Sequence, residues 1–251
     1  MKKQFLFIAV LASAILFSCT KERIETSQNQ PLEGTTTAHS STESVAKLSL
    51  PPIDPGLVGR FEFEGNLEDK SLQLPDGTSY GRGAVSYTSD RHGNAASALN
   101  MTGYYGINLN DVPMQTKASI AVWVKSAPTK VYRSFIGTNG SGPGFEQWDN
   151  RYYGGESIAS LGGFSQGIYP FAADNQWHHL AVTYDGANIR VYGDGVLSGT
   201  APFAGSFTQY LATYYLGYAP GVAGFWAGCL DDLRFYNRTL SAFDIQSMAS
   251  L

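Results

Sequence analysis

The sequence predicts an all-β domain built as a sandwich of antiparallel sheets, and three observations support that fold class. From Gly56 onward, short runs of alternating apolar and polar residues are broken by turn residues. Aromatic residues are dense and glycines are frequent over the same region, as in β-sandwiches. Only the segment 241–251 has a helical pattern, and Ser241 and Asp244 have the spacing of an N-terminal capping box. The roughly 195 residues from 57 to 251 fit one domain of this class.

Four segments have the composition and alternation of strands. Residues 119–125 (SIAVWVK) are the first of them, and residues 230–236 are the last. Between them, residues 180–184 and 189–192 are predicted to form the two arms of a β-hairpin. The pair Asp185-Gly186 separates these arms, and such a pair is a strong turn signal because both residues tolerate positive φ angles.

Two adjacent histidines, His178 and His179, begin the hairpin within the stretch 177–195. Neighbouring residues on a strand point to opposite faces of the sheet. We therefore do not expect both imidazoles to bind one metal ion. We interpret the stretch as sheet with one partly buried histidine, not as a catalytic centre, and Asp194-Gly195 as its next turn.

The N-terminus has the features of an export signal. Lys2 and Lys3 precede an apolar run that is shorter than the ~20 residues needed to cross a bilayer as a helix. The residues that follow, Leu16-Phe17-Ser18-Cys19, resemble the lipobox of bacterial lipoproteins. This resemblance implies that residues 1–18 are a signal peptide and that Cys19 carries lipid, which would anchor the protein to a membrane. Ordinary cleavage with an incidental Cys19 stays open as the alternative.

Residues 19–54 are predicted to be a flexible tether between the lipidated cysteine and a domain at 55–251. They are rich in Ser, Thr and Pro and almost lack aromatics, so they cannot bury enough apolar surface to fold. We expect the protein at the outer membrane or the cell surface of a bacterium.

The charge balance and the cysteines narrow the set of partners. The chain has 17 basic and 21 acidic residues, and loss of Lys2 and Lys3 with the signal would make it more acidic. This balance argues against nucleic acid or anionic lipid as a partner. With Cys19 lipidated, Cys229 has no partner for a disulfide and is expected to be a small buried residue.

Five blocks of the sequence occur in an order that is typical of one protein family. They are Leu57–Asn66 with Asp69 and Ser71, Asp90–Asn94 with Ala98–Asn100 and Gly103, Ser119–Lys125, Trp177–Gly195, and Gly228–Ser241. Together they resemble the laminin-G-like, concanavalin A-like jelly-roll domains, here in a bacterial lipoprotein, over essentially all of 57–251. The resemblance implies a concanavalin A-like jelly-roll sandwich of two antiparallel sheets with one short C-terminal helix.

Catalysis is not expected, although related folds host enzymes as well as lectins. A glycoside hydrolase needs two carboxylates about 5–10 Å apart across the sugar bond. Glu62 and Glu64 are two residues apart but lie on the first predicted strand, near the domain edge, and Glu146 and Asp149 have no third acid beside them. The strand motifs of jelly-roll hydrolases and polysaccharide lyases are not found in the sequence.

The predicted glycan site is centred on the segment 145–153 (FEQWDNRYY). Sugars stack their CH faces on aromatic rings, and their hydroxyls bond to amides and carboxylates. We expect ligand contacts from the side chains of Trp148, Asp149, Tyr152, Tyr153 and Trp226. Gly162, Gly163 and Tyr169 are expected to frame the same rim. The alternative, that these aromatics cover sheet edges or pack loops, stays open.

The resemblance also implies a structural calcium ion between the first and the closing strand. The positions that match are Glu64, Asp69 and Asp231. Calcium takes six to eight oxygen ligands, in part from the backbone. Because a sequence does not show which backbone carbonyls are available, a fold without calcium stays open as the alternative. Asp231 and Asp232 should face opposite ways on a regular strand, and Asp232 shares a face with Arg234 and is expected to pair with it.

Two classes of function fit these observations. The first is a membrane-anchored, non-catalytic, lectin-like module that binds a glycan or polysaccharide outside the cell, for a surface enzyme or transporter complex. The second is a structural or adhesive module that contacts protein and has no sugar site. A glycoside hydrolase or polysaccharide lyase is a more distant alternative.

Overall fold

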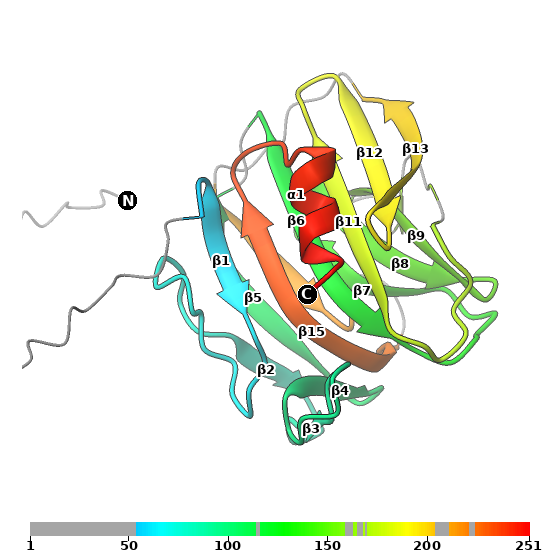
Figure 1. Cartoon of the computed structure of the whole chain (residues 1–251). Coiled ribbons are helices and arrows are strands. Elements are labelled where there is room, and N and C mark those ends of the chain that lie inside the picture. The colour runs from blue at the N-terminus through cyan, green and yellow to red at the C-terminus, as the bar shows by residue number, and fades with distance from the viewer. Residues whose placement is uncertain are drawn as a thin grey trace, which may run out of the picture. The chain divides into compact units, whose positions relative to one another are not determined.

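Two antiparallel β-sheets, packed face to face, make up the described part of the chain (Figure 1). The computed structural model describes residues 54–113, 116–158, 163–164, 168, 170–203, 211–220 and 224–251. The predicted signal peptide, Cys19, the tether up to residue 53, Gly162 and Tyr169 lie outside these residues. Within the described ranges, no helix has both the length and the apolar character needed to cross a membrane.

The front sheet faces the viewer in Figure 1. Its strands are β1 (Leu57–Phe61), β3 (Tyr87–Thr88), β4 (Ala98–Thr102), β6 (Ala118–Lys125), β11 (His178–Tyr184), β12 (Asn188–Gly193), β13 (Val196–Pro202) and β15 (Ala227–Tyr236). They follow the order β13-β12-β11-β6-β15-β4-β3, and β1 also pairs with β15.

The back sheet lies behind it. Its strands are β2 (Thr78–Gly81), β5 (Tyr105–Pro113), β7 (Arg133–Thr138), β8 (Ser141–Trp148), β9 (Arg151–Ile158), β10 (Gly163–Phe164) and β14 (Leu211–Leu216). They follow the order β10-β9-β8-β7-β14-β5-β2. The neighbours at the β2 end of this order, β7, β14, β5 and β2, come from distant parts of the chain, so the fold is a jelly roll rather than a simple meander.

The structure confirms the predicted fold class and the predicted elements. Residues 119–125 belong to β6, residues 230–236 to β15, and the predicted hairpin is formed by β11 and β12. Helix α1 (Ala242–Met248) begins after Ser241, whose hydroxyl accepts from the backbone N–H of Asp244, while the Asp244 carboxylate accepts from the N–H of Ser241. This reciprocal pair is the expected capping box.

Two local features of β15 differ from the expectation. Cys229 is half-buried rather than buried, and it lies opposite Lys125. A bulge separates Asp231 from Arg234, and Asp232 has a φ of 46°. The bulge breaks the alternation of the strand, so Asp231 and Asp232 line the same small pocket instead of facing opposite ways. The expected pairing of Asp232 with Arg234 is confirmed, with two bonds of 2.9 and 2.7 Å.

The core between the sheets is built from a stack of large rings. Phe135 of β7 stacks on Phe145 of β8, with ring centroids 5.8 Å apart, and on Trp226, with centroids 5.1 Å apart. Tyr152 of β9 meets Phe135 edge to face. All four side chains are fully buried, and each contributes on the order of 1.5–3 kcal/mol of hydrophobic free energy to folding.

A second, smaller core lies on the outward side of the front sheet, under helix α1, which crosses that sheet in Figure 1. Ile245 and Met248 of the helix pack here against residues of β6, β11, β12 and β15, namely Ala121, Ala181, Tyr192 and Tyr236. Because α1 covers this face, the outward face of the front sheet is partly closed to ligands.

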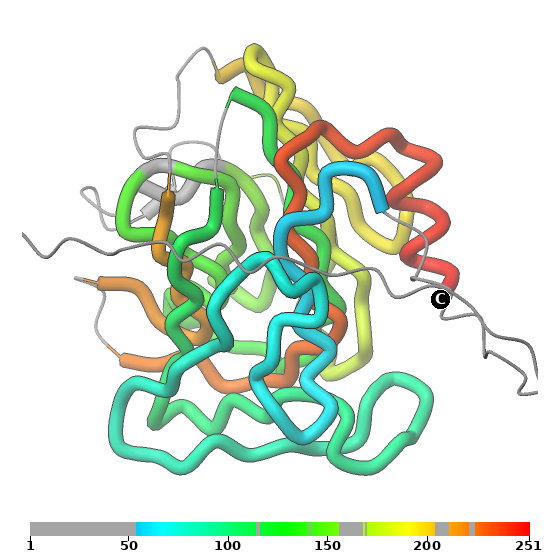
Figure 2. Tube along the Cα trace, turned by 90° about the vertical axis from the view of Figure 1, so that its left-hand side faces the viewer, coloured from blue at the N-terminus to red at the C-terminus, as the bar shows by residue number. Residues whose placement is uncertain are grey.

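The loop after β1 is organised by one buried carboxylate, Asp69, which is 3% exposed. Its two oxygens accept hydrogen bonds of 2.7–3.1 Å from the hydroxyl of Ser71 and from the backbone N–H groups of Arg60, Ser71, Gln73 and Leu74. The bond to Arg60 ties the loop to β1. β1 itself runs beside β15, so the first and last strands lie side by side (Figures 1 and 2).

Replacement of Asp69 by alanine is expected to lower the free energy of unfolding by about 3 kcal/mol or more, because several buried N–H donors lose a charged acceptor. Urea unfolding followed by tryptophan fluorescence measures the change. Glu68→Ala, at an exposed neighbouring position, is the control and should change stability little. Equal urea midpoints for Asp69→Ala and the unmodified chain would contradict this assignment.

Candidate functional site

The predicted aromatic site is divided between the two faces of the back sheet. Strands β8 and β9 continue through the segment expected to be a loop, so side chains alternate between the core and the outside. Trp148 and Tyr153 point outward, and their ring centroids lie 6.3 Å apart. Trp148 is 51% exposed, and Tyr153 is half-buried. These two residues stay candidates for ligand contact.

Tyr152 and Trp226 are corrected, because both side chains lie in the core and cannot reach a ligand at the surface. The Tyr152 hydroxyl lies 2.9 Å from that of Ser126. Trp226 Nε1 donates to Gln147 Oε1 over 2.6 Å. Buried polar atoms on large rings need such partners, and here the partners are other core residues rather than a sugar.

Asp149 and Asn150 form the two-residue turn between β8 and β9. Both have positive φ angles, 47° and 64°, as a tight hairpin turn requires. The Asp149 side chain is exposed. Its position is explained by the turn, and its role as a ligand contact stays a prediction.

The three residues expected to hold calcium do not form a ligand set. The oxygens of Asp69 face N–H and O–H donors, which an ion would have to displace. Asp231 accepts from the Arg91 guanidinium, while Glu64 lies at the same small pocket with an exposed side chain. Among the described residues, no group of three His, Cys, Asp or Glu side chains could hold a metal ion. These contacts do not fit a calcium ion bound by Glu64, Asp69 and Asp231.

The two histidines point to opposite sides, as expected, and each has its own surroundings. His179 packs edge-on against Trp123, and burial lowers its pKa to about 4, so the ring is neutral at pH 7. His178 stacks on Phe171, and its ring nitrogens lie 3.0 Å from Asp194 and 3.3 Å from Asp174. The bond to Asp194 raises the pKa of His178. The ring nitrogens of His178 are accounted for by these contacts, whereas the buried Nδ1 of His179 has no hydrogen-bond partner among the described residues.

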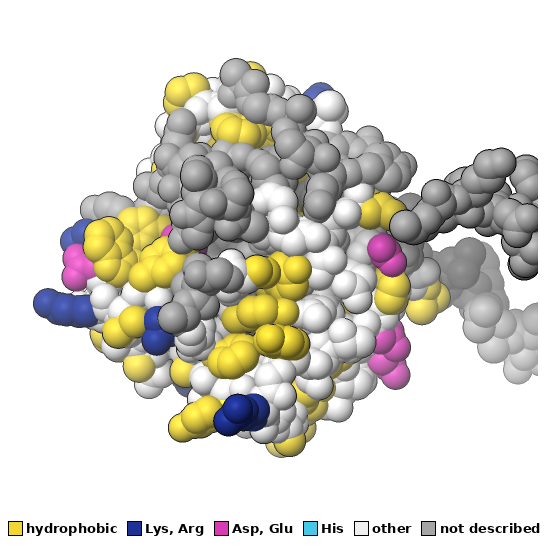
Figure 3. Space-filling model, turned by 180° about the vertical axis from the view of Figure 1, so that it is seen from behind, with side chains coloured by type: hydrophobic (Ala, Val, Ile, Leu, Met, Phe, Trp, Pro, Cys, Tyr) yellow, Lys and Arg dark blue, Asp and Glu magenta, His cyan; other side chains and the backbone are white. Residues whose placement is uncertain are grey.

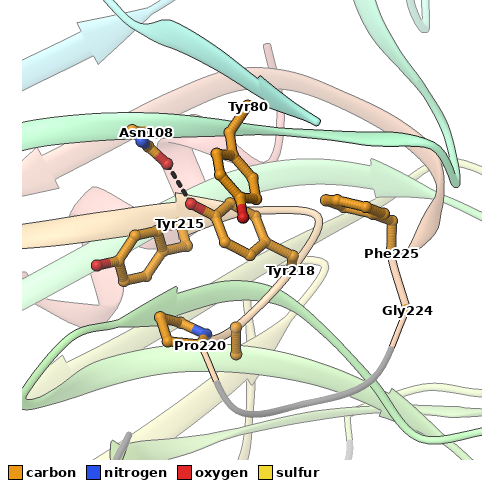
Figure 4. Close-up of a pocket in the computed structure, with 8 residues that line it drawn as sticks. Tyr80, Asn108, Tyr215, Tyr218, Pro220, Gly224 and Phe225 are labelled. Carbon is orange, nitrogen blue, oxygen red and sulfur yellow. Dashed lines mark hydrogen bonds between the residues drawn. The ribbon is translucent and has the colours of Figure 1, made fainter. Parts of the chain in front are cut away.

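A pocket on the outward side of the back sheet has the features of a binding site (Figure 4). Its volume is about 470 Å³. The rings that line it are Tyr80 from β2, Tyr215 from β14, and Tyr218, Pro220 and Phe225 from the segment after β14, and Asn108 of β5 adds an amide. Seen from behind, hydrophobic side chains gather on this side of the molecule (Figure 3).

Tyr218 is the central side chain of this pocket. Its ring stacks on Tyr80 with centroids 5.1 Å apart and planes 17° apart, and it meets Tyr215 and Phe225 at 4.9 and 5.7 Å. Its hydroxyl donates to Asn108 Oδ1, which is drawn as a dashed line in Figure 4. That bond occupies the Asn108 carbonyl oxygen and fixes the orientation of the amide. The Asn108 nitrogen therefore remains available as a hydrogen-bond donor to a ligand. Partial burial raises the pKa of Tyr218, so the phenol stays protonated.

A glycine in β5 allows the Tyr218 ring to lie against the sheet. A Cβ atom at Gly106 would lie 2.1 Å from Tyr218 Cδ1 and 2.6 Å from Cε1, well inside van der Waals contact. Any side chain here would displace the ring. Gly106 therefore shapes the pocket floor without contacting a ligand itself.

Arg133 fixes the far wall of the pocket. Its Nε donates to the carbonyl of Phe225 over 3.2 Å, and its Nη1 donates to the carbonyl of Tyr132 over 2.8 Å. The guanidinium also lies against Gly224, where a Cβ would meet it at 2.9 Å. A rigid planar donor of this kind holds an irregular segment in one place.

Sequence reasoning missed this pocket because its members are far apart in the chain. The available signal was the pair Tyr214-Tyr215 on a strand, where alternation requires one ring to point inward and the other outward. Tyr214 is indeed fully buried, while Tyr215 points into the pocket. The contributions of Tyr80, Asn108 and Phe225 depend on strand order, which the sequence does not show.

The arrangement is suited to binding rather than to acid–base chemistry. Flat rings offer stacking surfaces, and the Asn108 amide and the tyrosine hydroxyls offer hydrogen bonds. None of the described lining residues of this pocket is an Asp, Glu, His, Cys or Lys. The described lining of the pocket thus lacks the pair of carboxyl groups that glycoside hydrolysis uses.

The sequence matches one family. Residues 101–246, more than half of the chain, match the laminin G family described as the concanavalin A-like lectin/glucanases superfamily. No curated protein has a matching sequence.

Solved structures share the fold. Domain 4 of AbnA, a GH43 extracellular arabinanase from Geobacillus stearothermophilus in complex with arabinotriose, is 23% identical, with a TM-score of 0.62 over 77% of this chain and 98% of that domain. The binding domain of botulinum neurotoxin serotype D is 11% identical, with a TM-score of 0.58 over 78% of this chain. The binding domain of Paraclostridial Mosquitocidal Protein 1 is 14% identical, with a TM-score of 0.59 over 77%. This chain covers 50% and 52% of those two toxin chains.

The contacts of His178 predict a pH-dependent contribution to stability. Its folded-state pKa is raised above the unfolded value, so the contribution is fully present below pH ~6.5 and is lost as the pH rises through the folded pKa. We expect His178→Gln to cost about 1 kcal/mol at pH 5.5 and clearly less at pH 8.5, since the two carboxylates are partly screened by solvent. Urea unfolding of both proteins at the two pH values gives this difference. An equal cost of His178→Gln at both pH values would refute the ion-pair contribution.

Proposed function

Because the chain belongs to the concanavalin A-like lectin/glucanases superfamily, we propose that it is a non-catalytic, lectin-like module that binds a glycan. The observation that carries the proposal is the pocket around Tyr218. There, three further aromatic rings and an oriented amide converge on one cavity. This combination supports recognition of a sugar, whose CH faces stack on rings while its hydroxyls bond to amides and phenols.

The absence of described carboxylates from the pocket lining supports a binding role over hydrolysis. Outside the pocket, the outward-facing Glu146 bonds to Tyr132, and no second carboxyl group beside it is described. The arabinotriose complex of the structurally similar arabinanase domain is consistent with a glycan ligand. The receptor binding domain of botulinum neurotoxin D, which is also structurally similar, is consistent with a receptor-binding role for this fold.

We also propose that lipid on Cys19 anchors the protein to a bacterial outer membrane or cell surface. The proposal depends on the lipobox-like residues Leu16-Phe17-Ser18-Cys19. A module held on a tether would collect glycan for a partner enzyme or transporter, and the tether lets it search the nearby surface.

Replacement of Cys19 by alanine is expected to move the protein from the membrane fraction to the soluble exported fraction, because the acyl chains are lost. Cell fractionation and incorporation of labelled palmitate measure this change. Cys229→Ala should leave both readouts unaltered. Unchanged membrane retention and labelling of Cys19→Ala would sink the lipid-anchor proposal.

Glycan binding is tested with an array of glycans and polysaccharides, probed with the folded protein in calcium and again in chelator. A defined hit is expected. Tyr218→Ala and Gly106→Ala should each lower its affinity about tenfold or more, because the first removes the central ring and the second displaces it. We expect the hit to persist in chelator, since no described carboxylate lines the pocket.

Tyr104→Ala is the matched control, since this tyrosine is 70% exposed and lies outside the pocket lining. It should bind like the unmodified protein. No hit from folded protein in either condition would reject the glycan-binding proposal and favour a module that contacts protein.

A further inference from the structure

The back sheet carries a second aromatic contact on the same outward side as the pocket. Phe145, Gln147 and Tyr152 are buried in the core, so the alternating residues Glu146, Trp148 and Tyr153 point away from it. The same argument places Asn108 and Tyr215 of the pocket outward, between buried neighbours of β5 and β14. The two aromatic groups therefore lie on one face of one sheet.

Polar groups lie between them. Glu146 and Tyr153 are directly paired across β8 and β9, and Tyr132 donates to Glu146 Oε1. Burial raises the pKa of Glu146 to about 9, so this carboxyl group is protonated at neutral pH and can both donate and accept. On the neighbouring strand β7, Ser134 pairs with Glu146, and its buried hydroxyl has no partner among the described residues.

The pocket and this polar group are physically joined. Arg133 donates to the carbonyl of Phe225, in the pocket wall, and to the carbonyl of Tyr132, beside Glu146. The contacts therefore form a continuous series. It begins with the rings of Tyr218 and Phe225 and passes through Arg133 to Tyr132. From Tyr132 it continues to Glu146 and to Tyr153, which is paired with Glu146. Trp148 ends the series beside Tyr153.

The sheet order sets the length of this series. Four steps separate β5 from β9 in the order β9-β8-β7-β14-β5, and strands lie about 4.8 Å apart, so the series spans roughly 19 Å across the sheet. A single sugar ring cannot reach both ends. A chain of several sugar units that crosses the strands can.

We propose that Trp148 and Tyr153 form a second contact for the same glycan, so that the domain binds along the interior of a polysaccharide chain rather than at one terminal sugar. This inference depends on the proposed glycan-binding function. Tyr218 holds one unit, and Trp148 holds a unit further along the chain. Between them Glu146 and Ser134 are buried, at 6% and 3% exposure, so the intervening units pass over the half-buried side chains of Tyr132 and Tyr153. The ligand class is a linear polysaccharide with exposed internal units.

The test is a length series measured by calorimetry on the full chain. The probes are the disaccharide to hexasaccharide series from arabinan, xylan, cellulose, laminarin and chitin. For the unmodified protein, one series is expected to bind with affinity that rises with length. Trp148→Ala should weaken the hexasaccharide about tenfold and leave the disaccharide unchanged, whereas Tyr218→Ala should weaken both. Trp148→Phe, which keeps a ring, should recover part of the loss.

Phe243→Ala, which removes a 76% exposed ring on α1 of the front sheet, is the matched control and should bind every length like the unmodified protein. A hexasaccharide that binds no tighter than the disaccharide overturns the inference and leaves the proposed function standing. The same holds if Trp148→Ala binds the hexasaccharide normally. If no oligosaccharide of any length binds to folded protein, the inference fails, and the glycan array described above decides whether the proposed function fails with it.

Discussion

The stack of rings between the sheets is the constraint on which the rest of the domain depends. Gln147 is buried in this stack, where it accepts from Trp226 Nε1 and from the hydroxyl of Ser126 and donates to the carbonyl of Ala127. A buried amide with three such hydrogen bonds fixes its neighbours in one arrangement, since any shift leaves a polar atom unpaired. Trp226 is held this way, so the preceding Phe225 is fixed on the outside. The interior thus positions the wall of the candidate site.

The fold was predictable because its signals are local. The hairpin at 180–192 and the capped helix at the C-terminus each depend on residues close together in sequence, and the structure contains both. The candidate site was predictable only in part. Trp148 lies outside as expected, but Tyr152 and Trp226 are buried, because two strands replace the expected loop and their alternation decides which rings face water. The glycine-rich composition around this segment predicted a loop rather than those strands.

The acidic residues show a second limit of sequence reasoning. A carboxylate in a sequence can bind a metal ion, pair with a cation, or organise a loop, and the choice depends on which donors surround it. Asp69 is surrounded by backbone N–H groups, and Asp231 is paired with Arg91, whose guanidinium also covers the Trp123 ring at 4.8 Å. Near Asp231, the positive charge is thus supplied by the Arg91 side chain, where the resemblance implied a calcium ion.

The pairing of the first strand with the last has a mechanical meaning. A pull on the chain ahead of Asp54 reaches the domain through β1, which lies along β15 in the front sheet. Asp54 bonds to the Tyr236 hydroxyl at 2.7 Å, and Gly56 accepts from the N–H of Asn237 at 2.9 Å. Tension along β1 would load its ladder of hydrogen bonds together, in shear, rather than opening them one at a time. If the protein is tethered through Cys19 and binds a polymer on its back sheet, as proposed above, such a shear-loaded strand would resist flow and cell movement without a covalent cross-link.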